Sequence, residues 1–473
     1  MINNREVRKL ISSKIRKQFV AIVGEENVLD SESSLLNYSY DATPGFQARP
    51  HCVLAPRNVF EVSEIVKICN ANRIPIVPRG SGTNLSASTT PSKGGVVLLF
   101  KNMNEIIEID EANLTMTVQP GVITQRIIEA AEAKGLFYPP DPGSVNISQI
   151  GGNISTNAGG LHGLKYGVTR DYVIGLQVVL PNGEIIETGG KLAKDVAGYD
   201  LTRLFVGAEG TLGVITGAVL KLIPKPEATK TMLVLFEDLE TSAKAVSAII
   251  ENRIIPATLE FLDQATVRVV EDFAQIGLPT DAGAVLLIEQ DGPKEIVDRD
   301  TERMAKICME TGAMDVQVAQ TPEEAYELTS ARRTALSALS RMKPTTILED
   351  ATVPRSKIAE MVGIINEIAK KYELTVCTFG HAGDGNLHPT CLTDARDTEE
   401  MERVDAAFKE IFEEAVRLGG TITGEHGVGE MKLPYLSLKA GEAGVEAMRN
   451  IKFALDPNAI MNPGKMFTAK QQR

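Results

Sequence analysis

Three short stretches, each rich in glycine and in hydroxyl or amide side chains, lie within about ninety residues of one another and limit what the chain can form. They read PRGSGTNLS at 78–86, FYPPDPGS at 137–144 and QIGGNISTNAGGLHGLKYG at 149–167. Glycine lets backbone N–H groups approach a ligand closely, and consecutive N–H groups can form a concave anion-binding site. A single stretch could equally be an ordinary tight turn, but three together favour a bound pyrophosphate.

The familiar nucleotide-binding signatures do not account for these stretches. No G-x-G-x-x-G opens a helix after a strand, and the G-x-x-x-x-G-K-[ST] pattern of a P-loop does not occur. Arg79 could contact a phosphate or could be an exposed, solvated charge. A fourth stretch, Glu209-Gly-Thr-Leu-Gly213, either lies against a planar ring or is an irregular start to a strand.

The composition narrows the class of protein further. A chain of 473 residues that is 43% hydrophobic exceeds what one core usually fills, so we expect two or more domains. The net charge is -13 and no Lys/Arg-rich block occurs, which makes nucleic acid an unlikely partner. The five cysteines form no C-x-x-C pair, which argues against a disulfide framework or an iron–sulfur site and favours a reducing compartment. No apolar stretch approaches the roughly 18 residues of a membrane span, so we expect a cytoplasmic protein that reaches a membrane only through a partner.

The pattern of apolar residues divides the chain into segments. Residues 1–45 are expected to be helical, and a β-α-β unit should follow, with strands at 51–54 and 74–77 and a helix capped by Asn58. Residues 94–226 are rich in β-strand patterns, with a helix at about 124–134 and a hairpin turn at Pro181-Asn-Gly183. Beyond 226, short strands alternate with amphipathic helices, which predicts a second α+β domain. The helices are expected at about 240–252, 295–311, 355–372, 398–418 and 441–454.

Three of the five histidines, His381, His388 and His426, fall close together in the sequence. A hairpin with its turn at Ala382–Gly385 would bring His381 and His388 to one place, and Glu425 would add a carboxylate. Two imidazoles and one carboxylate suit a Zn, Fe or Mn site that keeps positions open for a substrate. The H-x6-H spacing is not specific, so polar turn residues remain the alternative, and Asp384 is expected to be a turn former.

Two further roles follow from this corner of the sequence. His426 is a candidate general base, because an unperturbed imidazole titrates near neutral pH. An anionic substrate would need a cation, and Arg332, Arg333 and Arg341 lie on LTSARRTALSALSR. At least two of these arginines are expected to be ordinary helix-surface charges.

Taken together, the motifs resemble a known family. PRGSGTNLS, YPPDPGS, GGNISTNAGG, LKYGVTRDYV and VGAEGTLGVIT resemble the FAD-binding domain of the vanillyl-alcohol-oxidase/PCMH flavoproteins. GHAGDGNLH and TGEHGVGEMK resemble the C-terminal half of the D-2-hydroxy-acid dehydrogenase branch of that superfamily. The resemblance covers roughly residues 40–466 and is close to the glycolate oxidase FAD subunits and the flavin D-lactate dehydrogenases.

The resemblance implies an α+β fold. It implies a PCMH-type FAD-binding domain of two α+β subdomains at 46–226, preceded by a helical arm at 1–45. An α+β substrate (cap) domain with an antiparallel sheet would occupy 227–418. A C-terminal segment at 419–473 would carry an active-site loop and return to the FAD-binding domain through Asn462 and Lys465.

The resemblance also assigns residues to cofactors. Relatives that bind flavin covalently carry a histidine near Thr83, so FAD is expected to be noncovalent here. The segment from Arg79 to Asn84 would wrap the pyrophosphate, and a divalent metal would be held by His381, His388 and Glu425. The residues expected to contact FAD are Pro78, Arg79, Gly80, Ser81, Gly82, Thr83, Asn84, Pro140, Asp141, Pro142, Ser144, Gly151, Gly152, Asn153, Asn157, Gly159, Gly160, Tyr166, Gly167, Glu209, Gly210, Gly213, Ile215 and Asn462.

The implied reaction is oxidation of a small D-2-hydroxy acid to the 2-oxo acid. Arg332 would bind the substrate carboxylate, His426 would remove the hydroxyl proton, and a hydride would pass to flavin N5. The electrons would leave to a partner, either an iron–sulfur subunit or an electron-transferring flavoprotein, or to a quinone. A homodimer is one of the assemblies that stay open.

One departure from the family pattern bears on the substrate. The hydroxyglutarate-specific relatives carry a threonine and a lysine at two positions near the substrate. In this chain the first position holds Leu336, and the second, at about residue 348, holds Leu348. D-lactate or glycolate is therefore favoured over D-2-hydroxyglutarate, with Arg341 or Lys343 as the alternative cation for a second carboxylate. Two rivals remain: a noncatalytic flavin-carrying electron-transfer subunit, and a flavin-dependent ether-lipid synthase, which is a transferase without net redox change.

Overall fold

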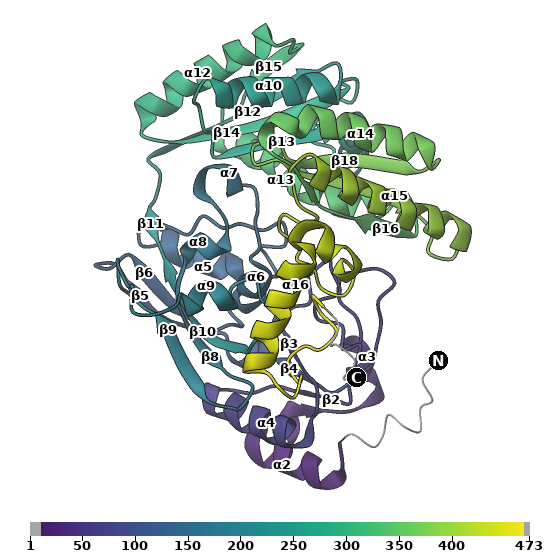
Figure 1. The fold of residues 1–473 in the computed structure, drawn as a ribbon. Helices are drawn as coiled ribbons and strands as arrows, with labels where there is room; N and C mark the ends of the chain where they lie inside the picture. Colours follow the sequence, from purple (N-terminus) through teal and green to yellow (C-terminus); the bar gives the residue numbers. More distant parts are fainter. Residues whose placement is uncertain (1–10, 468–473) are drawn as a thin grey trace. The chain divides into compact units, whose positions relative to one another are not determined.

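The computed structural model describes residues 11–467, and the chain within it forms two compact units. The first unit comprises the chain up to Ala158, Val168–Pro224 and the part from His426 onward (Figure 1). The second comprises Gly159–Gly167 and Lys225–Glu425. The first ten residues of the helical arm predicted at 1–45, and the last six of the segment predicted at 419–473, lie outside the described residues.

The first unit contains the predicted β-α-β arrangement. Its four-stranded sheet has the order β1-β2-β4-β3, with strands β1 (Val28–Leu29), β2 (Cys52–Leu54), β4 (Val96–Leu99) and β3 (Ile76–Arg79). Strands β2, β4 and β3 are parallel, and helix α4 (Val59–Asn72) connects β2 to β3. The Asn58 side chain accepts a hydrogen bond from the Glu61 N–H at 3.0 Å, which confirms the predicted cap.

A five-stranded antiparallel sheet forms the other half of this unit. Its order is β5-β6-β10-β8-β9, with β5 (Ile106–Asp110), β6 (Thr115–Val118), β10 (Val214–Lys221), β8 (Val173–Val179) and β9 (Ile185–Gly189). The turn between β8 and β9 has Gly183 at φ 86° and a backbone hydrogen bond from Leu180 to Glu184, which confirms the hairpin. The smaller elements of this unit are α5 (Thr124–Glu132), β7 (Leu136–Phe137), α6 (Ile150–Thr156), α8 (Thr169–Tyr172), α9 (Leu201–Phe205) and β11 (Ile223–Pro224).

The N-terminal segment is less helical than predicted. Helices α2 (Ser13–Val23) and α3 (Glu32–Asn37) flank a short 3-10 turn and strand β1. Strand β1 forms because Val28 and Leu29 pair with Leu54 and Val53 at the edge of the four-stranded sheet. On α2, the side chains of Ile15, Phe19 and Val23 are buried in the core of the first unit, so tertiary packing fixes this segment.

The C-terminal segment belongs to the first unit from His426 onward, whereas residues 419–425 of the predicted segment belong to the second unit. After helix α16 (Leu436–Leu455), Ile460 and Met461 enter the same core, and the Asn462 N–H donates to the Ile76 carbonyl at 2.7 Å. The buried Lys452 ammonium pairs with Asp456 and donates to the Thr211 carbonyl at 2.6 Å. Backbone pairing with Ile76 therefore joins residues near the C-terminus to the four-stranded sheet, and the Lys452 ammonium joins α16 to Thr211.

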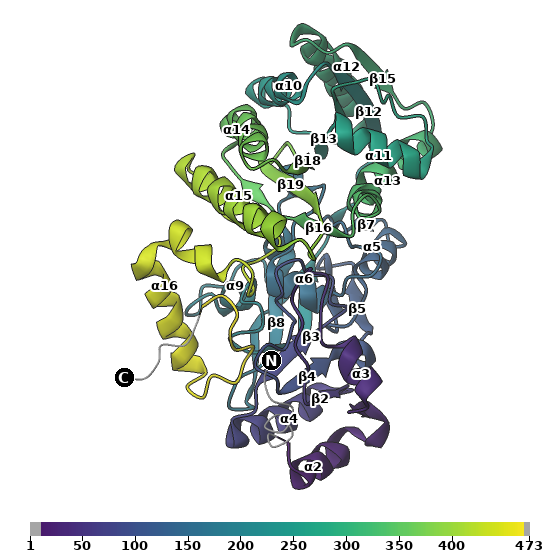
Figure 2. The same cartoon turned by 90° about the vertical axis from the view of Figure 1, so that its right-hand side faces the viewer.

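The second unit is built on one antiparallel sheet of eight strands. The order is β15-β12-β14-β13-β18-β19-β16, and β17 also pairs with β19. Helices α12, α10, α14 and α15 contact one another in that succession over one face, and α11 and α13 pack together over the other (Figure 2). The strands are β12 (Ala228–Phe236), β13 (Thr258–Asp263), β14 (Ala284–Gly292), β15 (Asp315–Val318), β16 (Thr345–Leu348), β17 (Ala351–Thr352), β18 (Thr375–His381) and β19 (Asn386–Thr393). The helices are α7 (Gly163–Tyr166), α10 (Leu239–Glu251), α11 (Gln264–Ala274), α12 (Lys294–Glu310), α13 (Pro322–Leu339), α14 (Ile358–Lys371) and α15 (Thr398–Arg417).

Helix α11 was not among the predicted helices. Its sequence contains Thr266, Val267 and Val270, which are β-branched and lower the helix propensity. The Asp263 side chain caps its first turn by accepting from the Thr266 N–H at 2.8 Å, and Val267 and Val270 are buried. Capping and packing therefore outweigh the local preference.

The sequence predicts neither a membrane span nor a disulfide framework. Within residues 11–467, no helix is both long enough and apolar enough to cross a membrane. All five cysteines are free and buried, in agreement with the absence of a disulfide framework.

Candidate functional site

The hairpin of β18 and β19 brings His381 and His388 together, as predicted. Phe379 lies opposite His388 in the register of the two strands, and His381 is two residues beyond Phe379. Because residues two apart on a strand share a face, the two imidazoles lie on the same side of the sheet. Their ring centroids are 5.0 Å apart.

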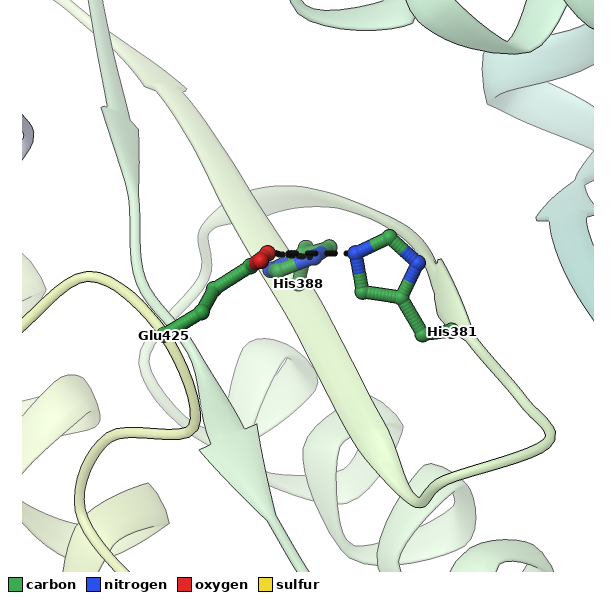
Figure 3. A group of neighbouring side chains, drawn as sticks. All are labelled: His381, His388 and Glu425. Carbon is green, nitrogen blue, oxygen red and sulfur yellow. Dashed lines mark hydrogen bonds and ion pairs between the residues drawn. The ribbon is translucent and has the colours of Figure 1, made fainter. Parts of the chain in front are cut away.

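Glu425 completes a cluster with these histidines (Figure 3). Its Oε1 lies 3.1 Å from His381 Nε2 and 3.3 Å from His388 Nε2. The Asp350 carboxylate holds the Glu425 backbone, because its Oδ2 accepts from the N–H groups of Gly424 at 2.6 Å and Glu425 at 2.8 Å. The three ligand atoms lie within 4.8 Å of one another, so this donor set fits a divalent metal with open positions.

The buried cluster changes the protonation of its members. Burial alone would raise the pKa of Glu425, but His381 and His388 together lower it well below the ordinary value. Burial opposes the charged form of His381 too, yet Glu260 and Glu425 raise its pKa well above the ordinary value. Burial lowers the pKa of His388, and it raises the pKa of the turn residue Asp384 to about 6. The cluster therefore concentrates negative charge around two imidazoles.

Glu260 is a member of this site that the sequence analysis missed. It lies on β13, with Oε1 2.7 Å from His381 Nδ1 and Oε2 2.8 Å from Arg332 Nε. The Arg332 guanidinium lies over the Phe379 ring, 4.7 Å from its centroid. The available signal was a single acid inside the apolar strand Thr258-Leu-Glu-Phe-Leu262, since a buried charge needs a partner.

The three candidate arginines have different environments. Arg332 is buried, so it is not a helix-surface charge. Arg333 is half-buried. Arg341 lies beyond the end of α13, is exposed, and stacks over the Phe273 ring at 5.2 Å.

Part of the third glycine-rich stretch lies in the second unit with the histidine cluster. The Tyr166 hydroxyl donates to Asp291 at 2.7 Å, and the Lys165 ammonium pairs with the same carboxylate. A side chain at Gly159 would place its Cβ 2.7 Å from the Glu425 carboxylate, so the approach of the backbone requires glycine there. Gly159, Gly160, Tyr166 and Gly167 therefore belong to the second unit, whereas the other predicted FAD contacts belong to the first.

In the first unit, Pro78 and Arg79 end strand β3, and the loop from Gly80 to Asn84 follows directly. Arg79 is buried, lies over the Tyr38 ring at 5.6 Å, and donates to Thr89 Oγ1 at 3.4 Å. The interpretation of Arg79 as a solvated charge is therefore wrong, and burial lowers its pKa. Gly82 has φ 76°, and any Cβ there would collide with the Arg79 guanidinium.

Asp41 braces this loop, which the sequence analysis did not anticipate. Its Oδ2 accepts from Asn84 Nδ2 at 2.8 Å and from the Thr89 N–H at 3.1 Å. The Ala42 N–H also donates to the Gly82 carbonyl at 3.0 Å. The Asp41-Ala-Thr-Pro-Gly45 break thus supports the predicted pyrophosphate loop.

The other predicted FAD contacts of the first unit lie on several kinds of backbone. Gly151, Gly152 and Asn153 are in helix α6, and Asn157 caps it in the left-handed conformation, so this stretch is not a simple turn. The Asn153 side chain is buried and donates to Thr124 Oγ1 at 2.6 Å. Pro140, Asp141, Pro142 and Ser144 lie in the loop after β7, and Gly80, Ser81 and Thr83 lie in the loop after β3.

Glu209 and Asn462 use their side chains to join distant segments of the first unit. The buried Glu209 carboxylate accepts from the N–H groups of Val428 at 2.7 Å and Gly429 at 2.8 Å, and from Ser88 Oγ at 2.8 Å. Asn462 Nδ2 donates to the carbonyls of Ser88 at 2.9 Å and Glu209 at 2.7 Å. We call these five residues the Glu209 cluster.

The residues that follow Glu209 lead into a strand. A Cβ on Gly210 would lie 3.1 Å from the Pro78 ring, and a Cβ on Gly213 would lie 2.8 Å from Val178. Ile215 is the second residue of β10. One of the two alternatives, an irregular entry into a strand, is therefore present, and it lies beside Pro78 near the end of β3.

The Glu209 cluster also fixes the position of His426 along the chain. The Ser86 hydroxyl donates to the His426 carbonyl at 2.9 Å, and the cluster holds the next residues, Val428 and Gly429. The backbone of the candidate base is therefore anchored by residues of the first unit at its own carbonyl and at the residues that follow it.

Two domain families and several known proteins are similar in sequence to this chain. An FAD binding domain family matches residues 50–189, and the C-terminal domain of FAD linked oxidases matches residues 225–466. The chain is 65% identical over 464 residues to a "Glycolate oxidase subunit GlcD" of Bacillus subtilis (strain 168), covering 98% of both chains. It is 37% identical to a "D-lactate dehydrogenase" of Anaerostipes hadrus, covering 89% of this chain and 90% of that one.

The fold has counterparts among solved structures. P-cresol methylhydroxylase with substrate bound superposes with a TM-score of 0.79 at 21% identity, covering 99% of this chain and 98% of that one. This likeness shows the PCMH-type α+β fold predicted from the glycine-rich motifs. Since the C-terminal family match alone spans half of the chain, the protein belongs to the FAD-linked oxidases and is an FAD-linked oxidoreductase.

Proposed function

We propose that the protein oxidises a small D-2-hydroxy acid, glycolate or D-lactate, to the 2-oxo acid with noncovalent FAD and a divalent metal. The observation that carries the proposal is the convergence of His381, His388 and Glu425 beside the buried cation Arg332. The names of the two relatives, a glycolate oxidase subunit and a D-lactate dehydrogenase, support the same substrate class.

Each residue of the site has a distinct role in this reaction. When bound, FAD supplies a two-electron acceptor, and a Zn, Fe or Mn ion on His381, His388 and Glu425 supplies positive charge that makes the substrate hydroxyl more acidic. The terminal N–H groups of Arg332 bind the substrate carboxylate, since its Nε is already paired with Glu260. His426 accepts the hydroxyl proton as the general base.

The surroundings of the site favour a substrate with one carboxylate. Leu348 is buried at the end of β16, and Leu336 is an apolar residue of α13. Arg341, a possible replacement cation for a second carboxylate, is stacked over Phe273. These features favour glycolate or D-lactate over D-2-hydroxyglutarate.

An anaerobic titration tests the proposal. The purified flavoprotein is mixed with a panel of D- and L-2-hydroxy acids, and the flavin absorbance is followed. Bleaching by glycolate or D-lactate, and not by L-lactate, is the expected result. Absence of bleaching by every acid would exclude the reaction and favour a transferase or a noncatalytic flavin subunit.

The reduced enzyme must pass its electrons onward. The sequence has no cysteine motif for a cluster of its own, and the relative from Bacillus subtilis is named as a subunit. We therefore propose an iron–sulfur subunit, an electron-transferring flavoprotein or a quinone as acceptor. The free, buried thiols suit a cytoplasmic location, with any membrane association made through that partner. Reoxidation of the reduced flavin by each acceptor class in stopped flow distinguishes them.

A further inference from the structure

We propose that Glu260 is a positioning residue of this site, which fixes the tautomer of His381 and holds Arg332 in place at the same time. The inference rests on the proposed function, because it assigns His381 to the metal and Arg332 to the substrate. Neither the family resemblance nor the sequence pattern assigned a role to Glu260.

The sheet places Glu260 beside His381. Phe261 on β13 lies opposite Gly380 on β18, so the next residues along the two antiparallel strands, Glu260 and His381, are also neighbours. Glu260 is fully buried, and its Oε1 lies 2.7 Å from His381 Nδ1. The contact is therefore set by strand register, independently of any loop.

As a metal ligand, His381 would be a neutral imidazole, and a carboxylate at Nδ1 would then select one of its two tautomers. With the proton on Nδ1 and donated to Glu260, the lone pair of Nε2 is available as a ligand. In the other tautomer, His381 would direct an N–H toward Glu425, 3.1 Å from Nε2, and would have no lone pair at that nitrogen. Glu260 thus makes Nε2 the metal-binding atom.

The second oxygen of Glu260 has a separate function. Its Oε2 lies 2.8 Å from Arg332 Nε, and the guanidinium is also packed on the Phe379 ring. Phe379 in turn contacts the His388 ring, with centroids 5.5 Å apart. One buried carboxylate therefore links a metal-ligating imidazole to the cation that binds the substrate.

The test compares two glutamate-to-glutamine variants of the same sheet in the full-length, FAD-loaded protein. E260Q removes the charge beside His381, and E289Q is the matched control. Glu289 lies on β14 and also neighbours a histidine, with Oε1 3.7 Å from His162 Nε2, but it lies outside the metal cluster. Zn²⁺ and Mn²⁺ dissociation constants are measured by chelator competition. E260Q should weaken both by about 10- to 100-fold, and E289Q should leave them unchanged.

A spectroscopic readout separates positioning from general stability. The visible bands of Co²⁺, read at wavelengths beyond the flavin absorption, should shift in E260Q and not in E289Q, because the ligand His381 loses its fixed tautomer. If E260Q does not fold, E260D keeps the charge and shortens the reach, and it should show the same loss of metal affinity.

Every outcome decides the proposal. Unchanged metal affinity in E260Q, or equal losses in E260Q and E289Q, overturns the role of Glu260 while the proposed function stands. If the native protein binds neither metal, the metal centre and the role of Glu260 are both wrong. The anaerobic titration with glycolate and D-lactate tests the oxidation reaction independently of that result.

Discussion

Two glutamates, one in each unit, illustrate how the same side chain takes different roles. Glu209 in the first unit accepts from two backbone N–H groups and a serine hydroxyl. Glu425 in the second unit lies beside two imidazoles, with Oε1 3.1 Å from His381 Nε2 and 3.3 Å from His388 Nε2. A backbone N–H group cannot change its acceptor without local unfolding, whereas the lone pair of a neutral imidazole nitrogen can bind a metal ion. The kind of donor therefore separates a structural carboxylate from a chemical one.

The pKa values of Glu209 and Glu425 are shifted in opposite directions. Burial raises the pKa of Glu209, and its hydrogen bonds from Val428, Ser88 and Gly429 offset this only in part. At Glu425 the burial effect is outweighed by His381 and His388, which lower its pKa. The comparison predicts that changes at Glu209 alter folding, while changes around Glu425 alter metal content and chemistry.

The largest effect is expected from removing an imidazole of the metal cluster. H388A should lose bound metal and reduce the rate of flavin reduction by more than about 100-fold, since loss of a ligand exceeds the loss of an outer-shell partner. Metal analysis and stopped-flow reduction measure the two effects, and FAD content should be unchanged. H162A is the control histidine in the same unit. Retention of metal by H388A would contradict the comparison.

The second effect tests Glu209. E209A leaves the N–H groups of Val428 and Gly429 and the Ser88 hydroxyl without their acceptor, which should cost roughly 3 kcal/mol of unfolding free energy. Urea unfolding monitored by circular dichroism measures this loss. Metal content should stay at the native level. Loss of metal without loss of stability would reverse the assignment of the two carboxylates.

A smaller effect is expected at Asp41, a third buried carboxylate with backbone and amide donors. D41A removes the brace of the loop after β3 and should weaken FAD binding by about tenfold, the equivalent of one or two hydrogen bonds. D41N keeps one acceptor oxygen and should lie between D41A and the native protein. Fluorescence of released flavin gives the dissociation constants. An unchanged constant in D41A would show that the loop does not need its brace.

The smallest effect is a dependence of stability on pH. Because the pKa of Glu209 is raised in the folded protein, its protonated form is favoured there. The resulting stabilisation is complete below the ordinary glutamate pKa and is lost as pH rises through the raised value. The unfolding free energy of the native protein minus that of E209Q should therefore fall across this interval. Urea titrations of both proteins at a series of pH values measure the difference, and a constant difference would refute the raised pKa.

The parts of the structure that the sequence predicted depend on local patterns. The hairpin around Ala382–Gly385, the Asn58 cap and the turn at Gly183 are each specified by residues within a few positions of one another. His381 and His388 could be paired in advance because only six residues of the hairpin separate them.

The parts that were missed depend on contacts between distant residues. Glu260 and His381 are 121 positions apart, and Glu209 and Val428 are 219 apart. A buried acid can be suspected from an apolar neighbourhood, but its partner depends on which strands become neighbours. Glu209 was predicted only as an FAD contact, and Asn462 as an FAD contact on a segment that returns to the FAD-binding domain. Their individual hydrogen bonds across the first unit could not be foreseen.

The division of the chain between Glu425 and His426 has a consequence for protein engineering. The proposed metal ligand ends one unit, and the proposed base begins the next part of the other. Their Cα atoms are held about 3.8 Å apart by a peptide bond, whatever else changes. A chimera that takes its second unit from a relative must therefore place the junction after His426. With a junction between the two residues, the metal ligand Glu425 and the base His426 would come from different proteins.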